Sequence, residues 1–578
     1  MNSRTLAHSL CAMVVATAYA SLAAAATPEA DLILDHGAIH TPSGVVSAIA
    51  IKNGVIIAIG DEAAVDAHKG QKTRVMDLHG DAVLPGLHDM HVHPMGAGLA
   101  KLACNFPQGS SPTVVRAAVQ RCAAKHAPGE WITGGQWEAS AFGATPPNRQ
   151  FLDLAAPNNP VVLTDISGHS AWANSKALQM AGITAATPNP PGGIIEKDAK
   201  GEPTGLLREA GASLVRGIVP PPTPEQNVQA LKSSLDLMLS YGITSLTDAV
   251  VDGNIAQAYA TLSDKGELKQ RVKGCLVWSR AMPALSNPSK PEYIEMRNLY
   301  ARERFSPTCI KIFLDGVPTD SHTAAMVEPY ADAGSMDAAR ARGLLQVPPA
   351  ALNAALIDFD KRGFTVKMHA AGDAAVREGL DAIEAARKAN GFSGQLHEVA
   401  HNSFVQMSDI KRARGIAATF EMSPYIWYPN PIIPDIAKAI GPERMKRWIP
   451  VKDAIDSGAL VVPGSDWSVV PSVDPWIAIE TLVTRQKPGG GGEVLGAQER
   501  ITLQQAIDLF TVNSAREMED RTKEGTLELG MLADLIVLDR DPYKIPITQV
   551  HDTHVKVTMI NGEIVYRAPQ GAHKGETP

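Results

Sequence analysis

The sequence predicts an α/β fold: a (β/α)8 TIM barrel joined to a small β-sandwich domain that is built from both chain termini. In the middle of the chain, apolar segments of strand length alternate with helical stretches, which is the pattern of a parallel barrel. Asn-Gly hairpin signals occur near both ends, and a long gap follows the first candidate barrel strand. These three observations define the predicted architecture.

Eight segments are candidate barrel strands because each is apolar and bounded by polar or turn-forming residues. They cover 82–93, 243–250, 271–279, 309–317, 364–373, 395–402, 415–423 and 458–466. Helical patterns such as Glu225 to Ser240 lie between most of them, and Thr502 with Gln505 predicts a capping box at the start of the last barrel helix. We therefore expect the barrel domain to span 82–518.

The gap at 97–240 is too long for a single helix and is rich in Pro and Gly. It predicts an insertion after the first barrel strand, at the end of the barrel where catalytic loops lie. At the termini, Asn53-Gly54 and Asn561-Gly562 each join two apolar runs, which is a strong hairpin signal. We expect 27–81 and 519–578 to form the N-terminal and C-terminal parts of one β-sandwich domain.

Residues 1–26 have the pattern of a secretory signal peptide. Arg4 precedes a short apolar core, and an Ala-rich segment ends at Ala26. The alternative is a membrane anchor, but the core is short and interrupted by polar residues, so we expect cleavage and a periplasmic or secreted protein. No later segment has the length and apolarity of a membrane span, so we expect no stable span after cleavage.

Composition limits the classes of partner. Hydrophobic residues make up 45% of the 578-residue chain and charged residues 20%, as in ordinary soluble proteins. The net charge of −8 offers no basic surface for nucleic acid. We expect a small-molecule substrate, and the sequence leaves a homo-oligomer open.

Four cysteines follow the predicted signal peptide. Cys104 and Cys122 flank a short segment and are candidates for a disulfide. Cys275 and Cys309 fall on consecutive predicted strands, and we expect them to be buried thiols, with a bridge left open. No Cys-x-x-Cys pair occurs, so thiolate metal sites have no support.

Polar residues occur at the ends of five of the predicted strands. His91 and His93 close the first strand and point to the same side of it, because side chains alternate along a strand. Alone, this His-x-His pair could be two ordinary polar residues. The fourth, fifth, sixth and eighth strands carry Lys311, His369, His401 and Asp466. Since the carboxyl ends of barrel strands meet on one face, we expect these six residues to converge.

The residues that converge belong to longer motifs, and together these motifs resemble the amidohydrolase superfamily, especially the branch that includes N-substituted formamide deformylase. The motifs are Pro85 to His93, His369 with Gly372-Asp373, His401, Gly464-Ser465-Asp466-Trp467, Gly135-Gln136-Trp137, Asn148 to Asp153, Ser167-Gly168-His169, Pro203-Thr204-Gly205 and Gly530 to Leu538. The resemblance covers nearly all of the chain that follows the signal peptide. It departs from the family at Leu396, Ala400 and Ser423.

The resemblance implies a metal-dependent hydrolase of amide or N-acyl carbon–nitrogen bonds other than peptide bonds. It implies that His91 and His93 bind one divalent metal ion, that His369 and His401 bind a second, and that Asp466 contacts the first. Four imidazoles favour zinc over magnesium. Lys311 matches the position of a carbamylated (carboxylated) lysine that bridges the binuclear metal centre, while an unmodified lysine paired with an acid is the alternative.

In the implied mechanism a metal-activated hydroxide attacks the substrate, and Asp466 acts as general base and then general acid. Weaker candidates for substrate contact or for orienting the ligands remain, each with an ordinary structural role as its alternative. They are Asp89, Trp137, His169, His322, Asp373, His397 and Trp467.

Two alternative functions stay open. The same centre could hydrolyse a lactone, a carbamate or a cyclic amidine, since the fold does not choose between them. A non-catalytic metal- or ligand-binding homologue is the third hypothesis, against which the presence of Asp466 argues. The sequence does not identify the physiological substrate, the metal, the number of ions or the oligomeric state.

Overall fold

The computed structural model describes residues 28–569 apart from 108, 138, 143–146, 166–169, 191–192, 280–291, 319–321, 335, 337, 339, 425–432 and 519–522. The predicted signal peptide, 1–26, and the candidate residue His169 lie outside the described residues. Within the described part of the chain, none of the helices combines the length and apolarity needed to cross a membrane.

Eight parallel strands form the central sheet, in the order β21-β20-β19-β18-β17-β16-β15-β8. Their hydrogen-bonded neighbours follow the order of the chain, as in a (β/α)8 barrel. The strands are β8 (Leu87–Val92), β15 (Ile243–Val251), β16 (Arg271–Ser279), β17 (Phe305–Phe313), β18 (Thr365–Ala370), β19 (Glu398–His401), β20 (Thr419–Met422) and β21 (Leu460–Pro463). At the open edge, the backbone N–H of Asp466 donates to His91 O at 2.7 Å, which joins the last strand to the first.

Helices surround this sheet and bury one large apolar core with it. They are α2 (Pro94–Leu102), α7 (Pro224–Ser240), α8 (Gly253–Asp264), α9 (Glu292–Glu295), α10 (Arg297–Tyr300), α11 (Pro349–Lys361), α12 (Asp373–Asn390), α13 (Met407–Ala413), α14 (Ile433–Ile440), α15 (Pro442–Met445), α16 (Val451–Asp456), α17 (Pro475–Thr484), α18 (Leu503–Asp508) and α19 (Ser514–Glu517). The predicted capping box of Thr502 and Gln505 is confirmed at α18. A π-helical turn, η5 (Leu509–Asn513), follows it.

The expected single strand over 82–93 is wrong, because the chain forms two strands there. β7 (Ala82–Pro85) pairs with a C-terminal strand in another sheet, and β8 begins after Gly86. A Cβ atom built on Gly86 would overlap the side chain of Thr244 on β15. Glycine therefore lets the chain pass close to β15 as it leaves one sheet and enters the barrel.

Two further sheets are built from the terminal segments, one from N-terminal strands alone and the other from strands of both termini. One contains β5 (Val55–Gly60), β4 (Ala48–Lys52), β1 (Leu32–Asp35) and β6 (Arg74–Asp77), and α1 (Glu62–Asp66) follows β5. The other contains β24 (Glu563–Arg567), β23 (Val555–Ile560), β22 (Leu535–Leu538), β7, β2 (Ala38–Thr41) and β3 (Gly44–Val46). Apolar side chains of the two sheets share one cluster. Both Asn-Gly hairpins form, with Asn53 and Asn561 in the left-handed region.

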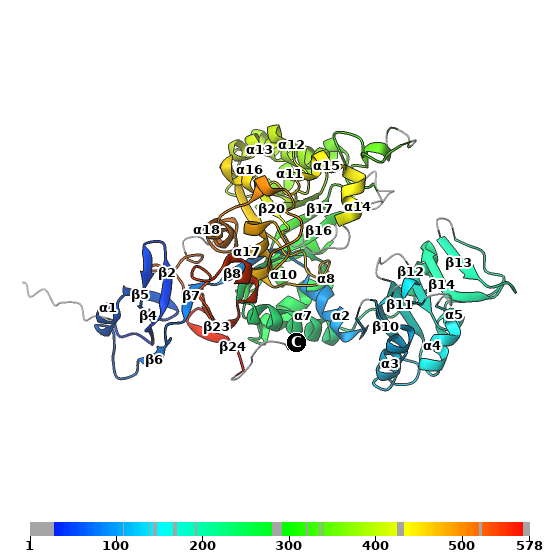
Figure 1. The fold of residues 1–578 in the computed structure, drawn as a ribbon, viewed down its shortest axis with the longest axis horizontal. Helices are drawn as coiled ribbons and strands as arrows, with labels where there is room; N and C mark the ends of the chain where they lie inside the picture. Colours follow the sequence, from blue (N-terminus) through cyan, green and yellow to red (C-terminus); the bar gives the residue numbers. More distant parts are fainter. Residues whose placement is uncertain are drawn as a thin grey trace, which may run out of the picture.

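The segment between α2 and α7 folds around a sheet of its own. The strand order is β13 (Gly193–Lys197), β14 (Pro203–Glu209), β12 (Ser170–Ala173), β11 (Val161–Asp165), β10 (Ile132–Trp137) and β9 (Cys104–Asn105). Its helices are α3 (Pro112–Ala123), α4 (Arg149–Ala155), α5 (Ser175–Met180) and α6 (Ala210–Arg216). Figure 1 shows this segment at one end of the molecule, the N-terminal strands at the other, and the barrel between them.

Two disulfides are present among the described residues. Cys104 and Cys122 form the one for which the sequence made them candidates. The expectation of buried thiols at Cys275 and Cys309 is wrong, because these residues are also bridged. The register of β16 and β17 places them directly opposite each other, with Cα atoms 4.1 Å apart. The strands alone did not reveal this register.

Candidate metal centre

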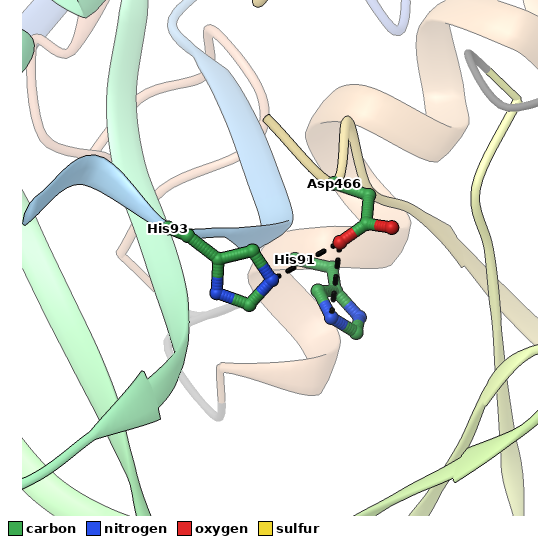
Figure 2. A group of neighbouring side chains, drawn as sticks. All are labelled: His91, His93 and Asp466. Carbon is green, nitrogen blue, oxygen red and sulfur yellow. Dashed lines mark hydrogen bonds and ion pairs between the residues drawn. The ribbon is translucent and has the colours of Figure 1, made fainter. Parts of the chain in front are cut away.

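The first group of site residues comes from β8 and β21, the first and last strands of the barrel sheet. His91 lies on β8, His93 directly follows it, and Asp466 follows β21. Asp466 Oδ1 is 3.0 Å from His93 Nε2 and 3.7 Å from His91 Nε2. Figure 2 shows the carboxylate turned toward both imidazoles. These donor atoms lie within 4.8 Å of one another, so the three residues could hold a single metal ion.

Lys311 approaches the same histidine from β17. Its Nζ is 3.2 Å from His91 Nε2, and the side chain is almost fully buried. Burial, with a smaller contribution from the charge of Lys367, lowers the pKa of Lys311 to about 8. A substantial fraction of this lysine is therefore the neutral amine near pH 8, which is its nucleophilic form.

His369 and His401 extend the cluster to the neighbouring strands β18 and β19. Their ring centroids are 4.3 Å apart, and the His401 ring lies 4.6 Å from that of His91. His369 Nε2 is 3.0 Å from the carbonyl oxygen of Gly316. Because a neutral imidazole donates from one nitrogen only, this contact leaves Nδ1 of His369 as the acceptor.

Burial keeps these imidazoles neutral. It lowers the pKa of His369 to about 4, with a further contribution from the charge of Lys311. Burial, and then the neighbouring cations, also hold the pKa values of His91 and His401 well below the usual range. Neutral imidazole is the form that binds metal, so these three histidines are in the required protonation state at neutral pH.

Glu421 on β20 is a site residue that the sequence analysis missed. Its Oε2 is 2.7 Å from His91 Nδ1, a contact that fixes Nδ1 as the donor and leaves Nε2 free to bind metal. The Ser423 hydroxyl donates to Glu421 Oε1 at 2.9 Å and lies 3.2 Å from His401 Nδ1. Burial raises the pKa of Glu421 to about 7. The only signal in the sequence was an acid between Phe420 and Met422 in an apolar strand.

Backbone geometry brings the strand ends together. A Cβ atom built on Gly464 would overlap both His91 Cβ and Glu421 Oε1, so only glycine allows this approach of β21 to β8. Asp89 accepts hydrogen bonds from the backbone N–H groups of His91 and Ser465, at 3.1 and 3.0 Å. Asp89 therefore contacts His91 through its backbone and not through the imidazole, and its role in orienting a ligand stays a prediction.

Asp466 and His401 adopt left-handed backbone conformations, with φ of 57° and 73°. For a residue with a side chain this conformation costs about 1–2 kcal/mol, and such strain is concentrated at functional sites. In this protein it occurs at two of the six residues that were predicted to converge.

Several weaker candidates lie outside the cluster. Asp373 was expected to orient a ligand, but its Oδ1 accepts from the backbone of Val327 at 2.7 Å. Asp315 is the carboxylate beside His369, with Oδ1 3.7 Å from Nε2. His322 pairs with Asp332 at 2.7 Å in the loop that follows β17. These contacts assign Asp373 and His322 to loop structure.

The remaining candidates are core residues. His397 is fully buried before β19, where Nε2 meets Asp360 Oδ1 at 2.9 Å and Nδ1 accepts from the backbone of Val366. Trp137 packs inside the inserted segment, where its indole donates to Leu163 O. The Trp467 side chain packs in the barrel core, while its carbonyl accepts from the backbone N–H of His93 at 2.6 Å. Apolar packing and satisfied hydrogen bonds therefore account for all three side chains.

The donor set fits divalent metal ions. Buried neutral imidazoles, carboxylates and a lysine with a lowered pKa converge within a few ångströms, which is the chemistry of a transition-metal centre. A second group of donor atoms, from His91, His401 and Glu421, also lies within 4.8 Å. Since Glu421 contacts the Nδ1 atom of His91, we assign it to orienting that ligand.

Comparisons with known proteins agree with this geometry. The model of the amidohydrolase family matches residues 74–566. YtcJ of Bacillus subtilis (strain 168) is 30% identical over 531 residues, covering 90% of this chain and 96% of YtcJ. The N-substituted formamide deformylase of Arthrobacter pascens is 27% identical over 538 residues, covering 90% of this chain and 94% of the deformylase. The crystal structure of an uncharacterized metal-dependent hydrolase from Pyrococcus furiosus superposes with a TM-score of 0.71 at 25% identity, covering 89% of this chain and 100% of that one.

Proposed function

The chain belongs to the amidohydrolase family, and we propose that this metal-dependent hydrolase cleaves the carbon–nitrogen bond of an amide or N-acyl compound other than a peptide. The observation that carries the proposal is the position of Asp466, 3.0 Å from His93 and 3.7 Å from His91. A carboxylate in this position can accept a proton from the attacking water and donate it to the leaving group. A relative that acts on N-substituted formamides supports the choice of bond.

We assign the ligands as follows. His91, His93 and Asp466 would hold one divalent ion, and His369 and His401 would hold a second, with zinc favoured by the imidazoles. Lys311, whose Nζ is 3.2 Å from His91 Nε2, would be their shared ligand as a carbamate. In that modification the neutral Nζ attacks CO2, a nitrogen–carbon bond forms, and one proton is released, which leaves an anionic carboxylate.

The bound ions would supply Lewis-acid polarisation of the substrate carbonyl and a lowered pKa for water. Asp466 accepts a proton from the water whose oxygen forms the new bond to the carbonyl carbon. It then passes that proton to the departing nitrogen as the carbon–nitrogen bond breaks. The products are a carboxylic acid and an amine, and Asp466 returns to its starting state. Glu421 holds His91 in orientation throughout.

The test is to screen metal-replete protein, with and without chelator, against formamides, N-acyl amino acids, aryl amides and lactones. The Asp466→Asn variant should lose about 10²- to 10⁴-fold in kcat on the best amide, with its metal content measured in parallel. Asp539→Asn, an exchange at an acid paired with Arg540, is the control.

Undiminished amide hydrolysis by Asp466→Asn would reject the mechanism, and hydrolysis of lactones alone would reject the choice of bond. A crystal structure with both metals bound and a plain amine at Lys311 would reject the carbamate.

We also propose that the protein is exported. The two disulfides support this proposal, because such bonds persist in oxidising compartments. Fractionation of cells that express the full chain, followed by mass analysis, should find a periplasmic or secreted form that lacks residues 1–26 and is four hydrogens lighter than the fully reduced chain. A cytoplasmic form that retains its N-terminus would contradict export.

A further inference from the structure

A cavity of about 450 Å³ opens beside the candidate metal centre, at the ends of β8 and β15, a size typical of small-molecule sites. Its walls are mainly apolar side chains from α2, β15, α8 and the loops beside them. They include Met95, Leu99, Pro222, Val250, Ile255 and Val469. Val469 lies at the rim and is 72% exposed.

The cavity adjoins the side of the centre on which Asp466 lies. His93 lines it and is 21% exposed, whereas the His91 side chain is 1% exposed. Ser468 and Val469, the second and third residues after Asp466, also line it. If Asp466 protonates the departing nitrogen, that nitrogen lies beside His93. A substituent on the nitrogen then projects into this cavity.

The charges of the wall restrict that substituent. None of the described residues that line the cavity is Lys or Arg, and its two acids are engaged within the protein. Asp248 accepts from Tyr259 Oη at 3.0 Å and from the backbone of Val250 at 3.2 Å. Asp252 caps α8 by accepting from the backbone of Asn254 and Ile255. A substituent that bears a carboxylate would find no Lys or Arg side chain on this wall and would approach two acids.

Asn227 on α7 supplies an independent sign of a ligand. Its side chain lines the cavity, is 9% exposed, and makes no hydrogen bond with the described part of the protein. The amide is therefore available to a ligand atom that donates or accepts a hydrogen bond.

We infer that this cavity binds the substituent on the substrate nitrogen, and that the substituent is an uncharged aliphatic or aryl group that can carry one hydrogen-bonding atom near Asn227. The inference rests on the proposed function, since Asp466 defines which side of the bond faces the cavity. On this inference, the substrates are neutral N-alkyl and N-arylalkyl amides and not N-acyl amino acids.

The test uses amides that share the acyl group cleaved best by the wild-type enzyme and that carry N-methyl, N-butyl, N-benzyl or N-carboxymethyl groups. The wild type should prefer N-benzyl to N-carboxymethyl by at least tenfold in kcat/KM. Ile255→Trp narrows the cavity and should lower the ratio of N-benzyl to N-methyl kcat/KM at least tenfold. The control is Leu529→Trp, an exchange of equal size at a leucine that is 68% exposed in the loop before β22, and it should leave the ratio unchanged.

The two possible failures give different results. If the wild type cleaves none of these amides in a metal-dependent way, the proposed function fails. If it cleaves them, but Ile255→Trp leaves the ratio unchanged or the N-carboxymethyl amide is preferred, the cavity assignment fails and the proposed function stands.

Asn227 is tested with N-benzyl and N-(hydroxybenzyl) amides. Asn227→Leu keeps a similar volume and removes the amide, so the wild-type preference for the best hydroxylated isomer should fall about tenfold. An equal change for both substrates would assign Asn227 a structural role and overturn the polar contact.

Discussion

At the scale of single residues, one carboxylate connects both halves of the centre. Glu421 contacts the imidazole of His91, accepts from Ser423, and accepts from the backbone N–H of His401 at 3.3 Å. His91 belongs to the first proposed metal and His401 to the second. Glu421 therefore contacts proposed ligands of both ions and is a positioning residue.

The first prediction is that Glu421→Gln weakens the metal centre. The variant keeps the size of the side chain and removes the charge that orients His91, and changes of this kind typically cost 10- to 100-fold in metal affinity or activity. We expect a loss in that range for both metal affinity and kcat/KM, measured by competitive chelation and by steady-state kinetics.

The matched control is Glu480→Gln. Glu480 is also a buried carboxylate paired with a histidine, with Oε2 2.6 Å from His551 Nδ1, but it lies on α17, outside the donor set. This variant should lose stability and retain stoichiometric metal. Equal metal affinity in Glu421→Gln and the wild type would show that Glu421 does not support the ligands.

The second prediction concerns pH and Asp474, which caps α17 by accepting from the backbone of Trp476 at 2.9 Å. Burial raises the pKa of Asp474 to about 7, against about 3.9 in an unfolded chain. Between these values the folded protein holds a proton that the unfolded chain releases, so the contribution of Asp474 to stability falls as pH rises from about 4 to 7.

Asp474→Asn keeps a good cap and cannot titrate. Its unfolding free energy, measured by urea titration, should therefore rise relative to wild type by on the order of 1–2 kcal/mol between pH 5 and pH 8. Asp61→Asn, at the exposed cap of α1, should stay within about 0.5 kcal/mol of wild type throughout. A constant difference for Asp474→Asn across this range would refute the expected titration.

The sequence predicted the histidines, Lys311 and Asp466 because the ends of parallel strands converge, whatever the loops do. It missed Glu421, because one acid within an apolar strand gives no sign of the residue it faces. It also selected Asp373 where Asp315 lies beside His369. Both acids flank strand ends, and only the path of the loop after β17 decides between them.

At the scale of elements, apolar runs placed all eight barrel strands in the right order, with bounds that differ by a few residues. The errors arose where a neighbouring element determines the structure. The run 82–93 is continuous in sequence, but close contact with Thr244 at Gly86 divides it between two sheets. Likewise, the pairing of Cys275 with Cys309 depends on the register of β16 and β17, which hydrophobicity does not encode.

The third prediction follows from the approach of β21 to β8. Gly464→Ala places a methyl group against His91 and Glu421, and overpacking in a closed site typically costs 1–3 kcal/mol. Since both side chains belong to the centre, we expect kcat/KM to fall more than tenfold in a protein that still folds, as judged by circular dichroism.

Gly415→Ala is the comparison for that variant. A Cβ atom there meets nothing within 4 Å, so stability should be unchanged or slightly higher and activity should match the wild type. Full activity in Gly464→Ala would show that the two strands can separate without moving His91.

At the scale of the whole molecule, the N-terminal and C-terminal segments pair in one sheet. β7 lies between N-terminal β2 and C-terminal β22, and it leads directly into the strand that carries His91. Lys556 on β23 pairs with Asp81 at 2.7 Å, which joins residues that are far apart in the sequence. Two β-rich ends in the sequence indicated this return, whereas the fold of the inserted segment depended on pairings between strands that no local pattern specifies.

The last prediction is that metal stabilises the entire barrel. The proposed ligands come from β8, β17, β18, β19 and the end of β21, so bound ions would connect several strands of the barrel. A ligand that binds only the folded state adds about 2.7 kcal/mol of stability at one hundred times its dissociation constant. Removal of metal by a chelator should therefore lower the melting temperature measured by calorimetry, and added zinc should restore it.

Two variants test where the stabilising metal ion binds. His91→Ala/His93→Ala should bind less metal and respond weakly to the chelator, because its centre is already incomplete. His36→Ala alters a surface group in which the His36 side chain is 58% exposed beside Asp35 and Asp77, and it should respond like the wild type. If His36→Ala abolished the response while His91→Ala/His93→Ala preserved it, the stabilising ion would bind at the surface and the barrel would not depend on the candidate centre.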